Sequence, residues 1–228
     1  IQMPKPYVID TESGTTHYGE QIEKVGGAVF STNNLEDITD EVKALLTEKH
    51  DFRTLILDSF TPAYDSELDK GERIVGSDWG RHYGYAKRGC KRLFDLLSML
   101  DMNVIVTAHS KNEYGENLKV IGTTFDGWKN LDYLFDLVFS LERRGKARIA
   151  VVRKTRLEEF PDQDTFEWSF DMLAKRYGGD LLTREATPIQ LATDDQVNLF
   201  RKLCEVLALD GELLLLGQRG DHYDRGAL

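Results

Sequence analysis

Leu55-Ile56-Leu57-Asp58 is the stretch of sequence that decides the fold, because three adjacent aliphatic residues run directly into an acid. A short apolar run without polar alternation is typical of a strand buried on both faces, as in a parallel sheet covered by helices. Two other stretches have the same form, residues 7–10 and residues 103–107. The sequence therefore predicts three strands of a parallel sheet, over residues 7–10, 54–58 and 103–107.

Two amphipathic helices are predicted between these strands. Residues 34–50 place apolar residues at helical spacing, and Asn34 with Asp37 resembles a capping box at the start. Residues 78–100 show the same spacing over a longer stretch. The predicted buried stripes are Leu35, Ile38, Val42, Leu45 and Leu46 in the first helix and Ala86, Cys90, Leu93, Leu97 and Leu100 in the second.

The remaining core segments predict loops and a hairpin. Residues 61–77 and 109–128 are polar and punctuated by glycine, which favours loops. Residues 133–142 and 146–154 are two strand-like runs joined by a basic turn, and residues 164–170 suggest one more strand. The predicted fold class is α/β, with a mainly parallel sheet between helices and an antiparallel hairpin at its edge.

The last fifty residues predict a separate tail. A turn-rich linker with Pro188 follows Gly178, and Thr193 with Gln196 then predicts a helix start. The apolar stripe of this helix is Val197, Phe200, Leu203 and Leu207. Residues 217–228 show no periodicity and are expected to be frayed. We therefore expect a core over residues 1–180, and a linker with a helical tail over residues 181–228.

Composition limits the function classes. The chain has 29 Lys and Arg against 39 Asp and Glu, a net charge of −10, so it does not coat nucleic acid through global charge. Residues 143–156 form a basic stretch without any acid, and two interpretations of it remain. It is either a solvated hairpin or a local contact surface for nucleic acid. The basic residues are Arg143, Arg144, Lys146, Arg148, Arg153, Lys154 and Arg156.

The expected compartment is the cytosol, with no membrane partner. No apolar run approaches the ~20 residues of a membrane span, and residues 1–6 lack the features of a secretory signal. The two cysteines, Cys90 and Cys204, both lie in predicted helices, which favours buried reduced thiols over a disulfide.

Polar residues follow all three predicted parallel strands, where ligands bind in such sheets. They are Asp10 with Glu12, Asp58 with Ser59, and His109 with Ser110. Asp58 fits a hydrated Mg²⁺ beside phosphates, or a carboxylate that only caps a loop. Glu12 could orient an attacking water or be an exposed loop acid. His109 could contact a terminal phosphate or simply end its strand, and neither cysteine has a partner at zinc-ligand spacing.

The order and spacing of these motifs resemble the RecA-like P-loop ATPases. The segments Tyr7-Val-Ile-Asp-Thr-Glu12, Leu55-Ile-Leu-Asp-Ser59 and Val104-Ile-Val-Thr-Ala-His109 look like three successive core strands of that family. The resemblance covers roughly residues 4–170. It is closest to the phage NTP-binding proteins associated with single-strand annealing and recombination, which carry a short helical C-terminal tail.

The resemblance implies ATP and Mg²⁺ as cofactors and a role for each strand end. By position, Glu12 matches the catalytic glutamate of the family, and Asp58 matches the Walker B aspartate that binds the metal. Asp10 and Ser59 are implied to lie beside the nucleotide. His109 stands where the family has a polar sensor, often glutamine. Farther along the chain, the resemblance implies cationic fingers, which are basic side chains that reach the nucleotide bound to a neighbouring subunit. Among them, Arg153 is expected to bind the nucleotide, and Lys154 and Arg156 are expected to take part in catalysis.

The two predicted loops, residues 65–77 and 111–127, occupy the places of the family's DNA-binding loops. The second contains candidate contacts to single-stranded DNA, because cations track the backbone and aromatic rings stack on bases. These candidates are Lys111, Tyr114, Lys119 and Phe125.

One departure from the family is large. A P-loop, GxxxxGK[ST], should precede the first strand by about one helix, and no such motif occurs in the sequence. Two explanations stay open, a truncated reading frame, which we favour, or a protein that has lost ATP binding. Either would weaken nucleotide affinity, and a missing first strand would leave a gap in the centre of the sheet.

The resemblance implies an ATPase that acts on single-stranded DNA in phage recombination or repair, in the cytoplasm of an infected or prophage-bearing bacterium. Implied partners are single-stranded DNA, further copies in a ring or filament, and a single-strand-binding protein. Two alternatives remain: a catalytically inactive RecA-like module that binds DNA or a partner, and a helicase-type RecA-like motor.

Overall fold

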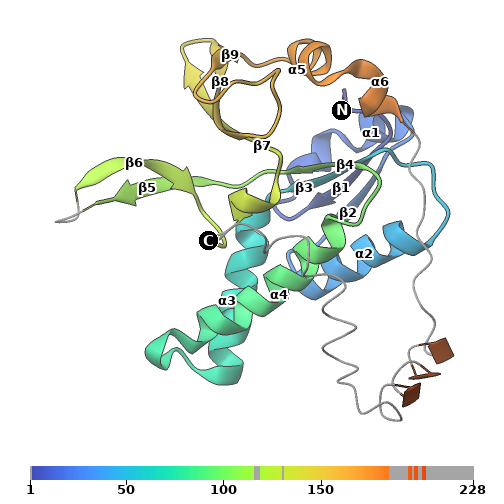
Figure 1. Cartoon of the computed structure of the whole chain (residues 1–228), viewed down its shortest axis with the longest axis vertical. Coiled ribbons are helices and arrows are strands. Elements are labelled where there is room, and N and C mark those ends of the chain that lie inside the picture. Colours follow the sequence, from blue (N-terminus) through green and yellow to red (C-terminus); the bar gives the residue numbers. More distant parts are fainter. Residues whose placement is uncertain are drawn as a thin grey trace. The chain divides into compact units, whose positions relative to one another are not determined.

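A four-stranded parallel sheet forms the centre of the computed structural model, in the order β2-β1-β3-β4 (Figure 1). The structure describes residues 2–115, 119–129 and 131–184, together with Asp195, Gln196, Asn198, Leu199, Lys202 and Leu203; the side chain of Tyr114 is outside this part. The strands are β1 (Pro6–Asp10), β2 (Ala28–Ser31), β3 (Thr54–Asp58) and β4 (Asn103–Val106). The predicted parallel sheet is therefore confirmed, and so is the α/β fold class.

The described strands of the parallel sheet pair without a gap between them, and β4 lies at the end of this order. β1 pairs with both β2 and β3, and β3 pairs with β4, in continuous register. Strand β2 was not predicted, because it lies at an end of the sheet and its side chains alternate between half-buried and exposed positions. Its four residues thus lack the continuous apolar run that reveals a central strand.

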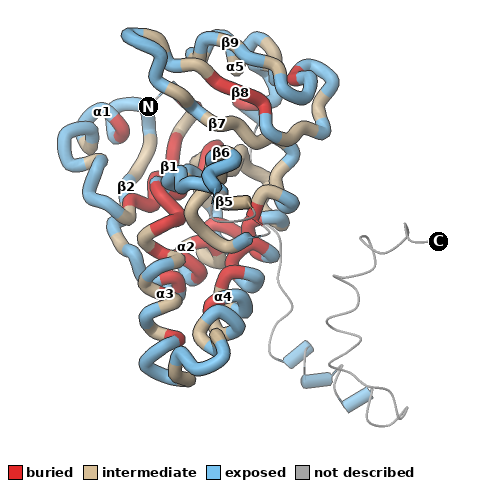
Figure 2. The backbone as a smooth tube through the Cα atoms, turned by 90° about the vertical axis from the view of Figure 1, so that its left-hand side faces the viewer, coloured by how far each residue is buried: buried red, intermediate tan, exposed pale blue. Residues whose placement is uncertain are grey.

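Three helices pack against one another and form a layer beside the sheet (Figures 1 and 2). They are α2 (Leu35–Thr47), α3 (Phe60–Val75) and α4 (Arg81–Leu97). The predicted stripes of α2 and α4 are buried, except that Leu100 lies beyond the end of α4 and is half-buried. Asn34 caps α2 through the N–H of Glu36, whereas Asp37 accepts from Thr32, so no reciprocal capping box forms.

Helix α3 corrects the prediction of a loop over residues 61–77, and with it one of the two predicted DNA-binding loops. Its buried face consists of Phe60 and then of small or polar residues. These residues let α3 approach α4 closely, but they give no apolar periodicity in the sequence. The buried residues after Phe60 are Thr61, Ala63, Glu67 and Gly71.

The second predicted loop is a hairpin rather than a loop. β5 (Ser110–Tyr114) pairs antiparallel with β6 (Val120–Phe125) and extends away from the parallel sheet (Figure 1). Most of its described side chains are exposed, so the strands show no apolar alternation that the sequence could reveal.

The predicted late hairpin is confirmed, but it does not extend the parallel sheet. β7 (Leu137–Arg144), β8 (Ala147–Thr155) and β9 (Thr165–Glu167) form a three-stranded antiparallel sheet of their own in the described part of the chain. Its core is aromatic, with Phe139 close to Phe160, Phe166 and Trp168. The predicted strand over residues 164–170 is shorter than expected, because α5 begins at Phe170.

Short elements complete the fold. They are η1 (Gly14–His17), α1 (Gly19–Lys24), η2 (Asp78–Gly80), η4 (Leu131–Leu134), α5 (Phe170–Tyr177) and α6 (Gly179–Thr183). The chain divides into two compact units, Ile1–Pro188 and Ile189–Leu228. The second unit is described only at six helical residues, so Cys204 and most of the predicted tail helix, including Thr193, lie outside the described part. Among the described residues no helix has both the length and the apolar character needed to cross a membrane.

Candidate functional site

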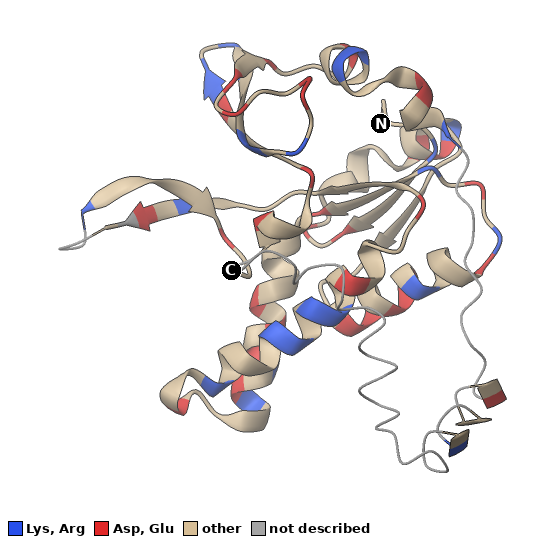
Figure 3. Ribbon diagram, viewed as in Figure 1, with Lys and Arg blue, Asp and Glu red and all other residues tan. Residues whose placement is uncertain are grey.

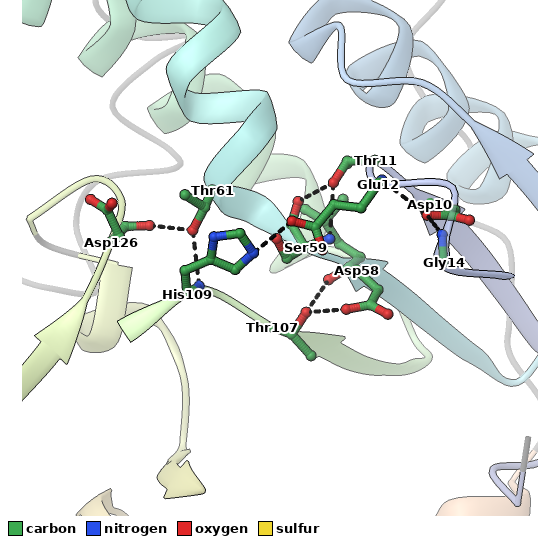
Figure 4. A network of polar contacts seen from close by, with 11 residues as sticks. Asp10, Thr11, Glu12, Gly14, Asp58, Ser59, Thr61, Thr107, His109 and Asp126 are labelled. Carbon is green, nitrogen blue, oxygen red and sulfur yellow. Dashed lines mark hydrogen bonds and ion pairs between the residues drawn. The ribbon is translucent and has the colours of Figure 1, made fainter. Parts of the chain in front are cut away.

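The three predicted strand ends meet at one end of the parallel sheet (Figure 4). The register of β1 and β3 places Asp10 beside Asp58, and the N–H of Thr11 donates to the carbonyl of Asp58 at 2.9 Å. On the other side of β3, the N–H of Thr107 donates to the carbonyl of Leu57 at 3.0 Å. Because parallel strands share one carboxyl end, residues far apart in the chain become neighbours here.

Glu12 and His109 are in direct contact across this end of the sheet. The distance from Nε2 of His109 to Oε1 of Glu12 is 2.6 Å (Figure 4). The His109 side chain is 54% exposed and that of Glu12 is 40% exposed, so solvent and a ligand can reach both. A carboxylate held in this way can accept a proton from a water molecule and can be repositioned through the histidine.

Asp58 lies beside this pair with an exposed carboxylate. The hydroxyl of Thr107 donates to Oδ1 of Asp58 at 2.5 Å and orients the carboxylate, and no donor to Oδ2 is found among the described residues (Figure 4). In the described part of the chain no group of three or more His, Cys, Asp or Glu side chains could hold a metal ion by itself. Mg²⁺ commonly takes only one or two carboxylates and keeps several waters, so Asp58 fits Mg²⁺ but not a cage of protein ligands.

The backbone next to Asp58 is fixed by Thr11. The Thr11 hydroxyl donates to the carbonyl of Ser59 at 2.8 Å and accepts from the N–H of the same residue at 3.0 Å. The Asp58–Ser59 peptide bond is cis. The Ser59 hydroxyl is buried and has no hydrogen-bond partner among the described residues. A buried polar atom of this kind would be satisfied by a bound polar ligand, which fits the predicted place of Ser59 beside a nucleotide.

Asp10 has a structural task that the sequence did not reveal. It is 2% exposed, and its two oxygens accept from the N–H groups of Glu12, Gly14 and Thr15 and from the Thr15 hydroxyl. Burial by itself raises the pKa of Asp10, but these hydrogen bonds together outweigh burial and hold the pKa below its ordinary value. Asp10 therefore shapes the loop that carries Glu12, and its predicted contact with a cofactor stays a prediction.

The backbone of His109 connects the site to the β5–β6 hairpin. Its N–H donates to the Thr61 hydroxyl at 3.0 Å, and this hydroxyl donates to the carbonyl of Asp126 at 2.6 Å (Figure 4). The N–H of Asp126 in turn donates to the carbonyl of His109 at 2.6 Å. Thr11, Thr61, Thr107 and Asp126 were missed by sequence reasoning, because an isolated threonine or acid after a strand carries no distinctive pattern.

The predicted DNA-binding residues all lie on this hairpin. Lys111 pairs with Asp126 at 2.8 Å, Lys119 is exposed where β6 begins, and Phe125 is half-buried opposite Ser110. Tyr114 belongs to β5, but its side chain is outside the described part. Their role toward DNA stays a prediction.

The predicted cationic fingers, Arg153, Lys154 and Arg156, contact residues 132–142 of the same chain. Lys154 donates to the carbonyls of Asp132 at 2.7 Å and Phe135 at 3.0 Å, and its Nζ lies 5.6 Å from the Tyr133 ring centroid. Burial, followed by the nearby Arg156, lowers the pKa of Lys154.

Arg153, near the end of β8, and Arg156, just after it, are held in a similar way. Arg153 donates to the Ser140 hydroxyl at 3.0 Å, and Arg156 pairs with Asp136 at 2.9 Å. The described contacts of all three cations are thus with residues 132–142, and no described contact joins them to Glu12, Asp58 or His109. Any action on a neighbouring subunit's nucleotide stays a prediction.

A parallel α/β sheet with carboxylates gathered beyond its strand ends is the architecture of a nucleotide-binding domain. Residues 1–161 match a family model described as "AAA domain", and the chain belongs to this family. The family consists of nucleotide-binding, ATPase-type proteins of the P-loop, RecA-like kind, which confirms that part of the resemblance. No curated protein matches the chain.

Proposed function

We propose that the chain forms the water-activating and metal-binding part of an ATPase that acts on single-stranded DNA in phage recombination or repair. The observation that supports this proposal most strongly is the contact of Glu12 with His109 beside the exposed carboxylate of Asp58. The base of the β5–β6 hairpin is hydrogen-bonded to the same histidine, so one residue joins a chemical site to a protruding element.

Each residue of the site has a task in this proposal. When bound, Mg²⁺-ATP supplies the phosphoryl group and the metal charge for hydrolysis. Asp58, oriented by the Thr107 hydroxyl, holds the metal through an oxygen, directly or through water. Glu12 orients the attacking water and accepts its proton. His109 sets the position of Glu12 and transmits a change there to the hairpin through its own N–H and carbonyl groups.

The hairpin then contacts single-stranded DNA. Lys111 and Lys119 follow the phosphates, and Phe125 with Tyr114 offers rings for stacking. Assembly into a ring or filament would let Arg153, Lys154 and Arg156 act on the neighbouring copy, once Lys154 and Arg156 leave the partners they have within one chain. A single-strand-binding protein would be a further partner on the same DNA.

The test measures ATP hydrolysis by the protein translated from the complete reading frame, with and without a poly-dT oligonucleotide. We expect DNA to stimulate hydrolysis, and we expect Glu12→Gln to lower kcat by about 10²- to 10⁴-fold while ATP binding persists. Glu20→Gln on α1 is the matched control, because Glu20 is exposed and forms only a 4.0 Å pair with Lys24. An unstimulated protein in which Glu12→Gln has no effect contradicts the proposal.

A catalytically inactive module that binds DNA is the second candidate, and the acid-free basic stretch with the exposed Arg143 and Arg148 favours it. This module would bind the oligonucleotide equally well with and without ATP and Mg²⁺. Asp58→Ala would then leave binding unchanged, whereas Arg143→Ala with Arg148→Ala would weaken it. Unwinding of a forked duplex by the complete protein would instead indicate a helicase-type motor.

A further inference from the structure

A groove of about 630 Å³ lies among α2, α3 and α4, and it shares no residue with the strand-end site. Its walls combine acids, cations and one aromatic ring, so its chemistry differs from that of an apolar core cavity. Its lining includes Glu67 and Lys70 on α3 and Tyr85, Arg88, Gly89 and Arg92 on α4.

Glu67 is the unusual residue of this groove. It is 7% exposed, and no hydrogen bond or ion pair to it is found among the described residues. Burial raises its pKa, the nearby Lys70 lowers it, and Glu36 raises it further. Glu67 lines the groove, and its carboxyl oxygens are not among the fully enclosed atoms that lack a hydrogen-bond partner, so water or a ligand in the groove can satisfy them.

Gly89 provides the space for this carboxyl. A Cβ atom at position 89 would lie 2.7 Å from Oε1 of Glu67 and 2.9 Å from Cδ2 of Leu35. The carboxyl therefore lies against the backbone of α4 at a point that only glycine leaves open. Any larger residue at position 89 would push Glu67 or Leu35 aside.

The cations at the rim divide into two kinds. Lys70 is paired with Glu36 at 3.1 Å, and Lys43 with Asp40 at 2.7 Å. Arg88 and Arg92, one turn apart on α4, are exposed and form no ion pair in the described part of the chain. Figure 3 shows that Lys and Arg residues are distributed along α4. The guanidinium carbon of Arg88 lies 5.9 Å from the Tyr85 ring centroid, which places a flat ring beside this cation. The charge of Arg92, like that of Lys43, also acts on the nearby Asp40.

We propose that this groove binds a small anionic ligand that carries a paired N–H donor edge, the chemistry of a guanine nucleotide. The donor edge would satisfy the Glu67 carboxylate, and the base would lie beside Tyr85. The phosphate would bind Arg88 and Arg92, because guanidinium groups form bidentate bonds with phosphate oxygens. Guanine is the fitting base, because N1–H and the N2 amino group are adjacent donors that a carboxylate can accept together.

The experiment is calorimetric titration of the 228-residue chain with GMP, IMP, AMP, guanosine and ribose 5-phosphate. IMP lacks the N2 donor, and AMP lacks the paired edge. We expect GMP to bind about tenfold or more tightly than IMP or AMP. Glu67→Gln should abolish this preference, because an amide presents a donor to one of the two guanine donors.

Two further variants locate the phosphate and the site. Arg88→Ala with Arg92→Ala should reduce GMP binding to the level of guanosine, whereas Arg81→Ala with Lys87→Ala, the matched control on α4, should leave it unchanged. Asp58→Ala should also leave it unchanged, because the strand-end site is separate. Gly89→Ala should weaken GMP binding by displacing Glu67, with the helical circular dichroism retained.

Several outcomes would overturn the proposal. Equal binding of GMP, IMP and AMP removes the paired-donor argument, and so does a Glu67→Gln variant that keeps the preference for GMP. Loss of GMP binding in Asp58→Ala would assign the ligand to the strand ends instead. Tighter binding of an arginine-rich peptide than of GMP would assign the groove to a protein partner, whose guanidinium also has paired donors.

Discussion

Nε2 of His109 lies 2.6 Å from Oε1 of Glu12, although three strands and four α-helices separate the two residues along the chain. The contact joins the loop after β1 to the residue that precedes the β5–β6 hairpin. Both side chains are about half exposed, and exposed pairs of this kind contribute only about 0–1 kcal/mol to stability. The contact therefore matters for the position of Glu12 more than for the free energy of unfolding.

His109→Ala should separate function from stability. Under the proposed function, loss of the contact should lower DNA-stimulated ATP hydrolysis by about ten- to a hundredfold, because Glu12 is no longer held in place. His109→Gln keeps an N–H donor and should retain most of the activity. Urea denaturation should show less than about 1 kcal/mol of change for either variant. A His109→Ala variant with normal DNA stimulation would contradict the positioning role.

Thr107→Val should alter the metal dependence of hydrolysis. The substitution removes the hydroxyl that donates to Oδ1 of Asp58 and keeps the shape of the side chain. We expect the Mg²⁺ concentration for half-maximal activity to rise, because Asp58 loses its orientation, and we expect Thr107→Ser to restore it. The measurement is ATP hydrolysis as a function of Mg²⁺ concentration. If Thr107→Val leaves the half-maximal Mg²⁺ concentration unchanged, Thr107 does not orient Asp58 for metal binding.

Asp10→Asn should destabilise the protein in a pH-dependent way. The hydrogen bonds to Asp10 depress its folded-state pKa, so its stabilisation is present above the unfolded pKa and is lost as the pH falls through the folded value. At neutral pH we expect a loss of about 1–3 kcal/mol in the free energy of unfolding. This difference should shrink below about pH 4, the ordinary range of aspartate. The exposed Asp69→Asn is the control, and a difference that grows toward acid pH would refute the argument.

Gly27→Ala tests the close packing of β1, α1 and β2. A Cβ atom there would lie 2.4 Å from the carbonyl oxygen of Pro6 and 2.8 Å from Cγ2 of Ile22. We expect the free energy of unfolding to fall by about 1–3 kcal/mol, as for other overpacked sites. Gly19→Ala has nothing within 4 Å of the added atom and should be neutral or slightly stabilising. Equal stability of the two variants would show that the backbone relaxes at position 27.

Arg176→Lys tests the antiparallel sheet. The guanidinium of Arg176 lies 4.4 Å from the Phe160 ring centroid and 4.8 Å from that of Phe166, and Nη2 is 2.8 Å from Oδ2 of Asp164. Lysine keeps the charge but loses the planar fork, so we expect thermal or urea denaturation to show a loss of about 1–2 kcal/mol. Lys175→Ala, on the exposed face of α5, should have little effect. A neutral Arg176→Lys would mean that charge alone is sufficient there.

The sequence by itself determined the elements that bury large apolar side chains. The continuous run Leu55-Ile56-Leu57 predicted a central strand, in which Leu55 and Leu57 are buried and Ile56 is half-buried, and the stripes of α2 and α4 predicted a packed layer. Because parallel strands share their carboxyl ends, the same pattern also predicted that Glu12, Asp58 and His109 would meet at one end of the sheet. Burial of apolar surface dominates folding, and it leaves its period in the sequence.

Only the tertiary structure decided the elements that bury little apolar surface. Helix α3 packs through Ala63 and Gly71, and β5 and β6 expose most of their described side chains, so neither leaves a period in the sequence. The hydrogen bonds of Thr11 and Thr107 depend on distances between strands that local propensity does not fix. Close approach of helices and direction of hydrogen bonds are properties of the packed chain, which is why the contact partner of Glu12 became visible only in three dimensions.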